Sequence, residues 1–170
     1  NPVPAIKTAR SIDASIAEYL EAGGGRLLRG STFYEDFAKT VCTINISWTG
    51  TQRLVNGLVN KIGDGFFPTP SQVISAGQDT LMNEVRMGFR SRVFYEATQR
   101  LIDSGLIDLS GNNSEEAISY DNLISIRGIG PYAASHMAVL LHDFRRVPVD
   151  SEVRRFCANR YGLSNDQISA

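Results

Sequence analysis

The chain has 170 residues, a formal net charge of −1 and 42% hydrophobic residues, enough apolar material for a sizeable buried core. This near-neutral balance is not typical of a nonspecific nucleic-acid binder. No secretory segment and no apolar run of membrane-spanning length is present, so we expect a soluble, intracellular protein. Cys42 and Cys157 lack metal-ligand spacing, and we expect two buried, reduced thiols.

Apolar residues recur at helical spacing along nearly the whole chain, which predicts an all-α protein. The first expected helix covers residues 6–21 and stops at Gly23-Gly-Gly25. Thr32 and Glu35 have the spacing of a capping box and begin a helix with an apolar stripe. Further helices are expected over residues 52–62, 71–75, 80–85 and 92–103.

The C-terminal part begins with a loop over residues 111–114, followed by short helices that lead into residues 121–126. A helix over residues 131–141 comes next, and residues 147–149 are expected to be extended. Asp150 can cap a helix that ends near Tyr161. Residues 164–167 resemble the start of another helix, so we expect one domain over residues 1–170, truncated at its C-terminus.

A glycine hairpin joins two of these helices. Gly128 and Gly130 flank Ile129, a pattern that suits a tight turn. Pro131 follows where a helix would start, because its missing N–H is no loss at the first helical position. The hairpin therefore presents backbone amides at a helix N-terminus, which favours an anion such as phosphate. A plain helix–helix turn is the alternative interpretation.

The ordered set of motifs resembles the helix-hairpin-helix (HhH-GPD) DNA glycosylase superfamily. The hairpin is Ile126-Arg-Gly-Ile-Gly130, a diagnostic position follows at Tyr132, and an acid follows Val147-Pro-Val149 at Asp150. Residues 35–45 resemble the first core helix of that family, and residues 67–70 and 87–92 resemble landmarks of its 3-methyladenine/alkylpurine and 8-oxoguanine branches. The resemblance implies an all-α, two-lobed fold with the helix-hairpin-helix at about residues 121–142.

Asp150 corresponds to the catalytic carboxylate of this family. On local sequence alone, an Asp before a helix is an N-cap. The two roles are compatible, because accepting amide hydrogen bonds keeps the carboxylate ionised. An ionised carboxylate stabilises the positive sugar that forms when an N-glycosidic bond breaks, and it can activate the attacking water.

Tyr132 stands where the bifunctional members have a lysine that forms a Schiff base. A phenol cannot form that adduct, so the resemblance implies a monofunctional glycosylase that uses water and lacks lyase activity. Tyr132 and Trp48 are candidate walls of a base pocket, with ordinary packing as the alternative for both. His136 is expected to be packed or exposed rather than catalytic.

A base inside a duplex must be flipped out before it can react, and side chains fill the gap. The positions that match the wedge loops of the family are Asn45 with Ile46, and Phe89 with Arg90. Phe89 would intercalate, and Arg90 would hydrogen-bond the orphaned partner base. The alternatives are a helix C-cap for Asn45, core packing for Ile46 and Phe89, and a solvated charge for Arg90.

The charges of the chain are unevenly spread. Residues 127–160 carry six arginines against three carboxylates, and residues 86–100 carry four arginines against one. We expect these to form one basic face for DNA phosphates. The predicted partner is double-stranded DNA with a damaged or mispaired base, bound by a monomer located with the DNA in a nucleoid or nucleus.

No cofactor or catalytic metal is expected, and this chain lacks the four cysteines of an iron–sulfur cluster. The resemblance implies a monovalent cation held by hairpin carbonyls between Arg127 and Gly130. The leading hypothesis is removal of an alkylated purine in base excision repair. Removal of 8-oxoguanine or of thymine or uracil opposite guanine is the alternative, and a noncatalytic DNA-binding module is the alternative of another class.

Overall fold

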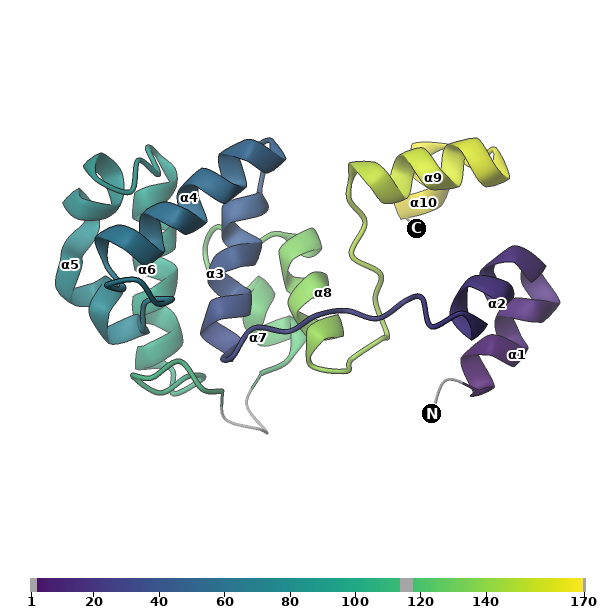
Figure 1. Cartoon of the computed structure of the whole chain (residues 1–170), viewed down its shortest axis with the longest axis horizontal. Helices are drawn as coiled ribbons and strands as arrows, with labels where there is room; N and C mark the ends of the chain where they lie inside the picture. Colours follow the sequence, from purple (N-terminus) through teal and green to yellow (C-terminus); the bar gives the residue numbers. More distant parts are fainter. Residues whose placement is uncertain (1–2, 114–117, 170) are drawn as a thin grey trace.

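The computed structural model describes residues 3–113 and 118–169, and this part of the chain is helical, with no strand beyond one isolated bridge between Ile107 and Asn113. Figure 1 shows two groups of helices, joined by extended segments, with both termini in the second group. The helices are α1 (Val3–Ile12), α2 (Ala14–Glu21), α3 (Phe33–Thr43), α4 (Trp48–Lys61), α5 (Pro70–Asn83), α6 (Arg90–Asp103), α7 (Tyr120–Ile124), α8 (Pro131–Leu140), α9 (Ser151–Tyr161) and α10 (Asn165–Ser169). We call α3–α8 the main lobe and α1, α2, α9 and α10 the terminal lobe. The expected all-α, two-lobed fold is confirmed.

The core of the main lobe is built around α3. Thr32 caps this helix by accepting a hydrogen bond from the Glu35 amide, and Glu35 in turn accepts from the Ser31 amide. The stripe behind the cap includes Phe33 and Phe37, which are at most 2% exposed. α4, α6, α7 and α8 contribute further buried side chains to this core. α3 is therefore the central element of the lobe, in contact with both α4 and α8.

Two expected helix boundaries were wrong. The helix expected over residues 6–21 is broken at Asp13, whose side chain accepts a hydrogen bond from the Ser15 amide and caps α2. A short acidic side chain competes in this way with a continuing helix. The helix expected from residue 52 begins at Trp48 instead, because Ser47 caps it by accepting from the Gly50 amide.

The other expected helices agree closely with the structure. The two short helices expected within residues 71–85 are one element, α5, which is interrupted at Gly77 with φ 79°. The expected hairpin helices are α7 and α8, of which α7 ends at Ile124. Ser114 and part of the following segment with short expected helices lie outside the described residues. Residues 147–150 are non-helical, and α9 and α10 follow as expected.

The terminal lobe is held together by a polar cluster. Arg160 of α9 donates hydrogen bonds to both carboxylate oxygens of Asp13, and the Tyr161 hydroxyl also donates to this carboxylate. Hydrogen bonds from Ser15, and then from Arg160 and Tyr161, hold the pKa of Asp13 well below its usual range despite desolvation. Of the described residues in α1, α2 and α9, only Ala17 is buried.

The two cysteines are free thiols in different surroundings. Cys42 is buried, and burial raises the pKa of its thiol to about 12, so the thiol stays protonated. Cys157 is only partly buried, contrary to the expectation of two buried thiols. None of the helices in the described ranges has the length and apolar character needed to cross a membrane.

A buried hydrogen bond between α3 and α6 offers a test of this core. The Thr98 hydroxyl donates to the Phe94 carbonyl at 2.8 Å, so the Tyr34 hydroxyl is the donor in its 2.9 Å contact with Thr98. We expect Tyr34→Phe to lower the free energy of unfolding by about 1 kcal/mol. Thr98→Val leaves the Tyr34 hydroxyl without its acceptor and should cost more, about 1–3 kcal/mol. Denaturant unfolding measures both, and an equal or smaller loss for Thr98→Val would contradict the assignment.

Candidate functional site

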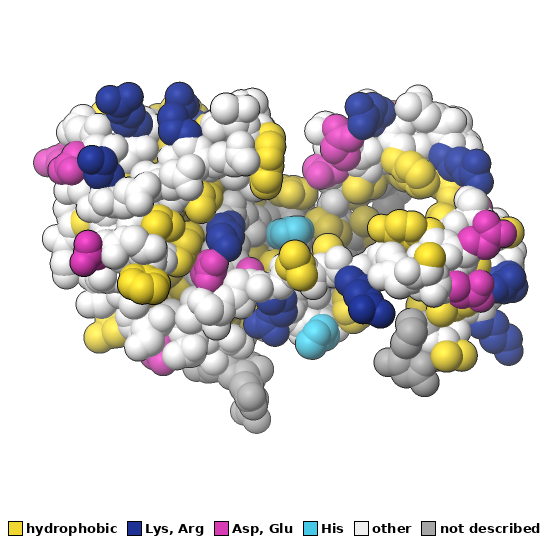
Figure 2. All heavy atoms as spheres, in the orientation of Figure 1, with side chains coloured by type: hydrophobic (Ala, Val, Ile, Leu, Met, Phe, Trp, Pro, Cys, Tyr) yellow, Lys and Arg dark blue, Asp and Glu magenta, His cyan; other side chains and the backbone are white. Residues whose placement is uncertain are grey.

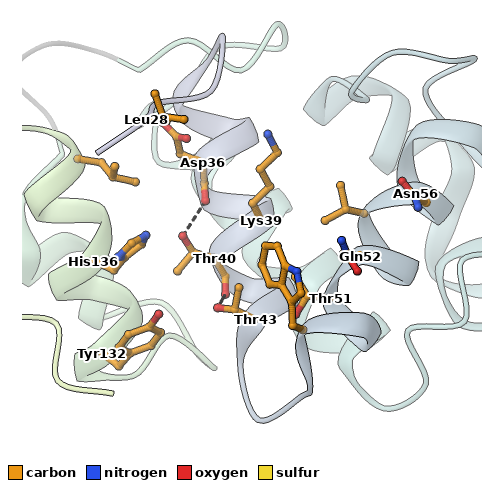
Figure 3. Close-up of a pocket in the computed structure, with 13 residues that line it drawn as sticks. Leu28, Asp36, Lys39, Thr40, Thr43, Thr51, Gln52, Asn56, Tyr132 and His136 are labelled. Atoms are coloured by element: carbon orange, nitrogen blue, oxygen red, sulfur yellow. Dashed lines mark hydrogen bonds between the residues drawn. The ribbon is translucent and has the colours of Figure 1, made fainter. Parts of the chain in front are cut away.

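A cavity of about 630 Å³ opens on the main lobe between α3, α4 and α8, beside the extended segment that carries Leu28. Figure 3 shows its walls, with Tyr132 and His136 on one side and residues of α4 on the other. The lining residues are Leu28, Asp36, Lys39, Thr40, Thr43, Trp48, Thr51, Gln52, Val55, Asn56, Tyr132, His136 and Leu140. A cavity of this size falls in the usual range for small-ligand sites.

Aromatic side chains form the flat walls of this cavity. Tyr132 and His136 lie one turn apart on α8, with ring centroids 5.9 Å apart and planes inclined by 21°. Trp48, the first residue of α4, is 71% exposed and lines the same cavity. The structure therefore brings the two predicted pocket residues, Tyr132 and Trp48, into one site. Flat π surfaces of this kind can stack on a planar ring.

The sequence interpretation missed several polar residues of the cavity. His136 was expected to be packed or exposed, but it is half-buried in the cavity wall. Gln52 and Asn56 lie one and two turns after Trp48 on α4, and all three line the cavity. That spacing was the available signal, because residues four apart share a helix face.

Asp150 lies at the start of α9, as expected, and its carboxylate accepts a hydrogen bond of 2.8 Å from the Val153 amide. It is partly buried and is not one of the cavity-lining residues. The carboxylate is nevertheless close enough to act on His136. Burial lowers the pKa of His136, and the charges of Asp36 and then Asp150 oppose that shift.

The two hairpin glycines have different reasons to be glycine. Gly128 has φ 88°, and a Cβ there would lie 2.1 Å from Val93 Cγ1 of α6. Gly130 has φ −89°, and a Cβ there would meet nothing within 4 Å. Gly130 is also the N-cap of α8 without a side-chain cap, so the first amides of α8 keep their hydrogen-bonding capacity. The fold thus requires Gly128, whereas only another molecule approaching the hairpin would require Gly130.

Ile129 and Arg127 complete the hairpin. The Ile129 side chain is 4% exposed and belongs to the core, so only its backbone can face a ligand. The Arg127 side chain is 78% exposed and lies 3.9 Å from Glu96. Within the described residues, the carbonyl oxygens of Gly128 and Ile129 accept no backbone hydrogen bond outside the helices. Carbonyl oxygens of this hairpin are the groups that the family resemblance implies as ligands of a monovalent cation.

The predicted wedge residues also come together. Asn45 has φ 50° just after α3, and Phe89, which is 79% exposed, lies just before α6. Together with Arg90 and Gly128 they line a cleft of about 130 Å³. Ile46 instead packs against the core and is the wedge candidate least able to reach DNA.

Arg90 is engaged by the protein itself. Its Nη2 donates to the carbonyls of Ile44 at 3.3 Å and Asn45 at 2.9 Å, and its guanidinium lies 4.6 Å from the centroid of the Phe89 ring. These contacts tie the end of α3 to the start of α6. Most of the donors that Arg90 was expected to offer to a partner base are therefore already in use.

The expected single basic face is not apparent on the side of the molecule in Figure 2, where Lys and Arg side chains are interspersed with Asp and Glu on both lobes. Several arginines are paired with nearby carboxylates, including Arg92 with Glu96 and Arg145 with Asp143. Ion pairs on exposed surfaces leave less positive potential for a polyanion.

Replacement of Arg90 by Ala should free the two loops that it joins. We expect a loss of about 1 kcal/mol in the free energy of unfolding, because charged hydrogen bonds to two carbonyls disappear at a partly exposed site. Arg92→Ala on the same helix is the matched control, and loss of its exposed pair with Glu96 should cost about 0.5 kcal/mol or less. Chemical unfolding measures the free energy of unfolding of both variants. Equal losses in the two variants would show that Arg90 does not link the two loops.

No protein-family model and no curated protein matches this chain. Among solved structures, the chain resembles MBOgg1 in complex with a low-affinity DNA ligand, with a TM-score of 0.75 and 23% sequence identity. The likeness covers 98% of this chain and 61% of the MBOgg1 chain, so this chain spans less than two thirds of that protein. The likeness shows that the chain has the all-helical fold of a DNA glycosylase structure.

Proposed function

We propose that this protein is a monofunctional DNA glycosylase of base excision repair. The observation that carries the proposal is the placement of Tyr132 and Trp48 on one cavity, together with Asp150 at the start of α9, whose charge acts on His136 in the wall of that cavity. A flipped base would enter the cavity and stack on the aromatic walls, and its sugar would remain near Asp150. The likeness to a DNA-bound structure supports DNA as the partner.

In this proposal Asp150 acts on the sugar and on water. Breaking the N-glycosidic bond leaves positive charge on the sugar, which the carboxylate stabilises while it accepts a proton from the attacking water. The hydrogen bond from the Val153 amide fixes the orientation of this carboxylate at the start of α9. Because Tyr132 offers no amine, the product is an intact strand with an abasic site.

The resemblance of residues 67–70 to the alkylpurine branch favours an alkylated purine as the excised base. Residues 87–92 resemble the oxidised-guanine branch as well, so 8-oxoguanine is the second candidate. Thymine or uracil opposite guanine is the third candidate. A noncatalytic helix-hairpin-helix module remains the alternative class, and it would bind DNA in a salt-dependent way without releasing any base.

The substitution Asp150→Asn distinguishes the catalytic role of Asp150 from its role as the N-cap of α9. Asn caps a helix about as well as Asp, so the free energy of unfolding should change by less than about 0.5 kcal/mol. Release of a damaged base in a single turnover should fall by about 100-fold or more, because the amide cannot accept the proton of water. Strand scission in the wild-type reaction should require alkali. Unchanged base release by Asp150→Asn would refute the catalytic assignment, and DNA binding without release from any duplex would favour the noncatalytic module.

Alanine substitutions at the two hairpin glycines test whether the hairpin contacts DNA. We expect Gly130→Ala to keep the free energy of unfolding within about 1 kcal/mol, because its φ suits any residue and its Cβ meets open space. The same change should weaken duplex binding several-fold, because the added methyl group stands where a phosphate would approach the amides. Gly128→Ala should instead destabilise the fold by about 1–3 kcal/mol through its positive φ. Fluorescence anisotropy and thermal unfolding measure the two effects, and wild-type DNA binding by Gly130→Ala would show that the hairpin does not meet DNA.

A further inference from the structure

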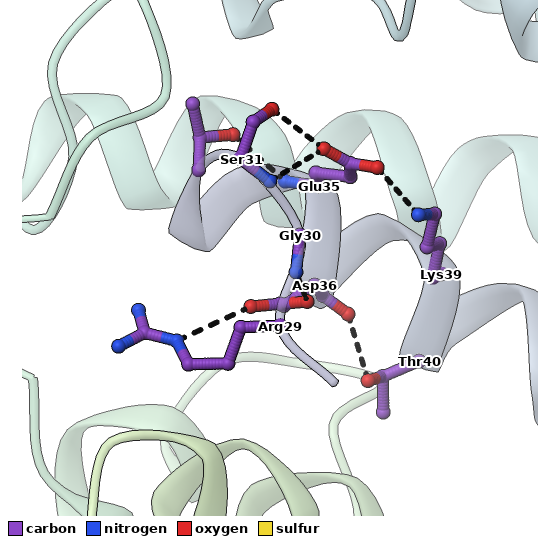
Figure 4. Close-up of polar contacts among 8 residues, drawn as sticks. Arg29, Gly30, Ser31, Glu35, Asp36, Lys39 and Thr40 are labelled. Carbon is purple, nitrogen blue, oxygen red and sulfur yellow. Dashed lines mark hydrogen bonds and ion pairs between the residues drawn. The ribbon is translucent and has the colours of Figure 1, made fainter. Parts of the chain in front are cut away.

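The two fully charged side chains that line the cavity are each paired with an opposite charge. Asp36, which is 6% exposed, accepts a 2.7 Å hydrogen bond from the Gly30 amide, and its Oδ2 lies 3.8 Å from Arg29 Nε. That second distance is too long for a hydrogen bond, so Arg29 neutralises Asp36 as an ion pair. Lys39 is paired with Glu35 on the same helix (Figure 4).

The threonine hydroxyls of the cavity are also engaged. Each donates to a backbone carbonyl: Thr40 to that of Asp36 at 2.8 Å, Thr43 to that of Thr40 at 2.7 Å, and Thr51 to that of Cys42 at 3.1 Å. Each hydroxyl has only one proton to give. These threonines therefore cannot donate a further hydrogen bond to a molecule in the cavity.

Uncharged polar groups of the cavity remain open to a bound molecule, as do the unused N–H donors of Lys39, whereas Asp36 Oδ2 is buried and accepts no hydrogen bond. Within the described part of the chain, no hydrogen bond joins the side chains of His136, Gln52 or Asn56 to another residue. Among these, His136 lies on the aromatic wall, where its ring is stacked on Tyr132. A base stacked along this wall would bring its edge within reach of the imidazole.

Burial keeps His136 in a form that both donates and accepts, although two nearby carboxylates oppose this effect. Asp36 on α3 and Asp150 at the start of α9 act on it, and Lys39 on α3 lines the same cavity. Burial is the largest effect and lowers the pKa of His136 below its ordinary value. The imidazole is therefore mainly neutral near neutral pH, with one N–H donor and one acceptor nitrogen.

We infer that His136 contacts the extruded base and assists its departure, which makes this cavity selective for bases that are neutral when bound. The inference rests on the proposed function but reverses its order of substrates, which placed an alkylated purine first. It favours 8-oxoguanine or a mispaired pyrimidine over a ring-methylated purine that carries a positive charge. A cationic base leaves readily without help, whereas a neutral base departs with excess negative charge that a donor must stabilise.

The proposed reaction is the hydrolysis of the N-glycosidic bond. The bond between C1′ and the base nitrogen breaks, and its electron pair goes to the base. His136 donates a hydrogen bond to the departing base, or transfers a proton when the imidazole is protonated. The oxygen of water bonds to C1′, and the proton lost by that water goes to Asp150.

The test compares single-turnover release of 8-oxoguanine and of 7-methylguanine from otherwise identical duplexes, between about pH 5 and pH 8, the range in which histidine titrates. His136→Phe keeps a stacking ring without an N–H, and His136→Gln restores a donor. His142→Asn is the matched control, because His142 is the other histidine, lies outside this cavity and has φ 67°, which Asn tolerates.

For 8-oxoguanine we expect His136→Phe to lose about 10- to 100-fold in rate, and His136→Gln to recover part of that loss. The wild-type rate should rise as pH falls toward the lowered pKa of His136, and this rise should be absent in both His136 variants but present in His142→Asn. Release of 7-methylguanine should change less than about threefold, because that leaving group needs little assistance from an acid.

Equal losses on both bases, or an unchanged pH profile in the His136 variants, would overturn the inference and leave the glycosylase proposal standing. Release of 7-methylguanine alone by the wild-type protein would also overturn it. Absence of release from either duplex and from one carrying thymine opposite guanine, together with intact DNA binding, would remove the proposed function itself.

Discussion

The close approach of the hairpin backbone to α6 determines much of the rest of the site. Gly128 lies against Val93 so tightly that no side chain fits between them. This contact fixes where the hairpin turns, and the turn fixes where Pro131 begins α8. The side chains one turn apart on α8, Tyr132 and His136, then form one wall of the cavity. α6 starts at Arg90, so the same contact keeps the exposed Phe89 near the hairpin.

The cavity combines flat aromatic walls with charged side chains that are each paired with an opposite charge. Its buried carboxylate and its amine are both neutralised from outside the cavity, by Arg29 and Glu35. What remains for recognition is stacking surface, uncharged hydrogen-bonding groups and the unused N–H donors of Lys39. Such a site discriminates by the pattern of donors and acceptors on a ring, because leaving a buried polar group without a partner costs about 1–3 kcal/mol.

Helix periods and capping residues predicted most of the fold. Thr32, Asp150 and Pro131 each mark a helix start, because local hydrogen bonding and backbone geometry decide such positions. The break at Asp13 was missed because the apolar spacing continues across it, whereas its side chain bonds locally and reaches Arg160 in a distant segment.

The site was predictable where a motif carried it and not elsewhere. Tyr132 and the hairpin were predicted through their spacing, and Trp48 through its proximity to Asn45. Asp150 was predicted through its spacing as well, but it does not line the cavity. Gln52 and His136 belong to no motif, and their place in the cavity depends on how α4 and α8 face each other across α3. The engagement of Arg90 with two carbonyls was equally hidden, because it joins residues more than forty positions apart.

Two extended connections link the lobes, and one of them carries a residue that borders the cavity. The connection between α2 and α3 carries Leu28, which borders the cavity and is 95% exposed, and the connection between α8 and α9 ends at Asp150. The ion pair between Asp13, which precedes α2, and Arg160, near the end of α9, joins the two helices to which these connections lead. Because this ion pair holds α2 and α9 together, a displacement of one connection at its terminal-lobe end would carry the other connection with it.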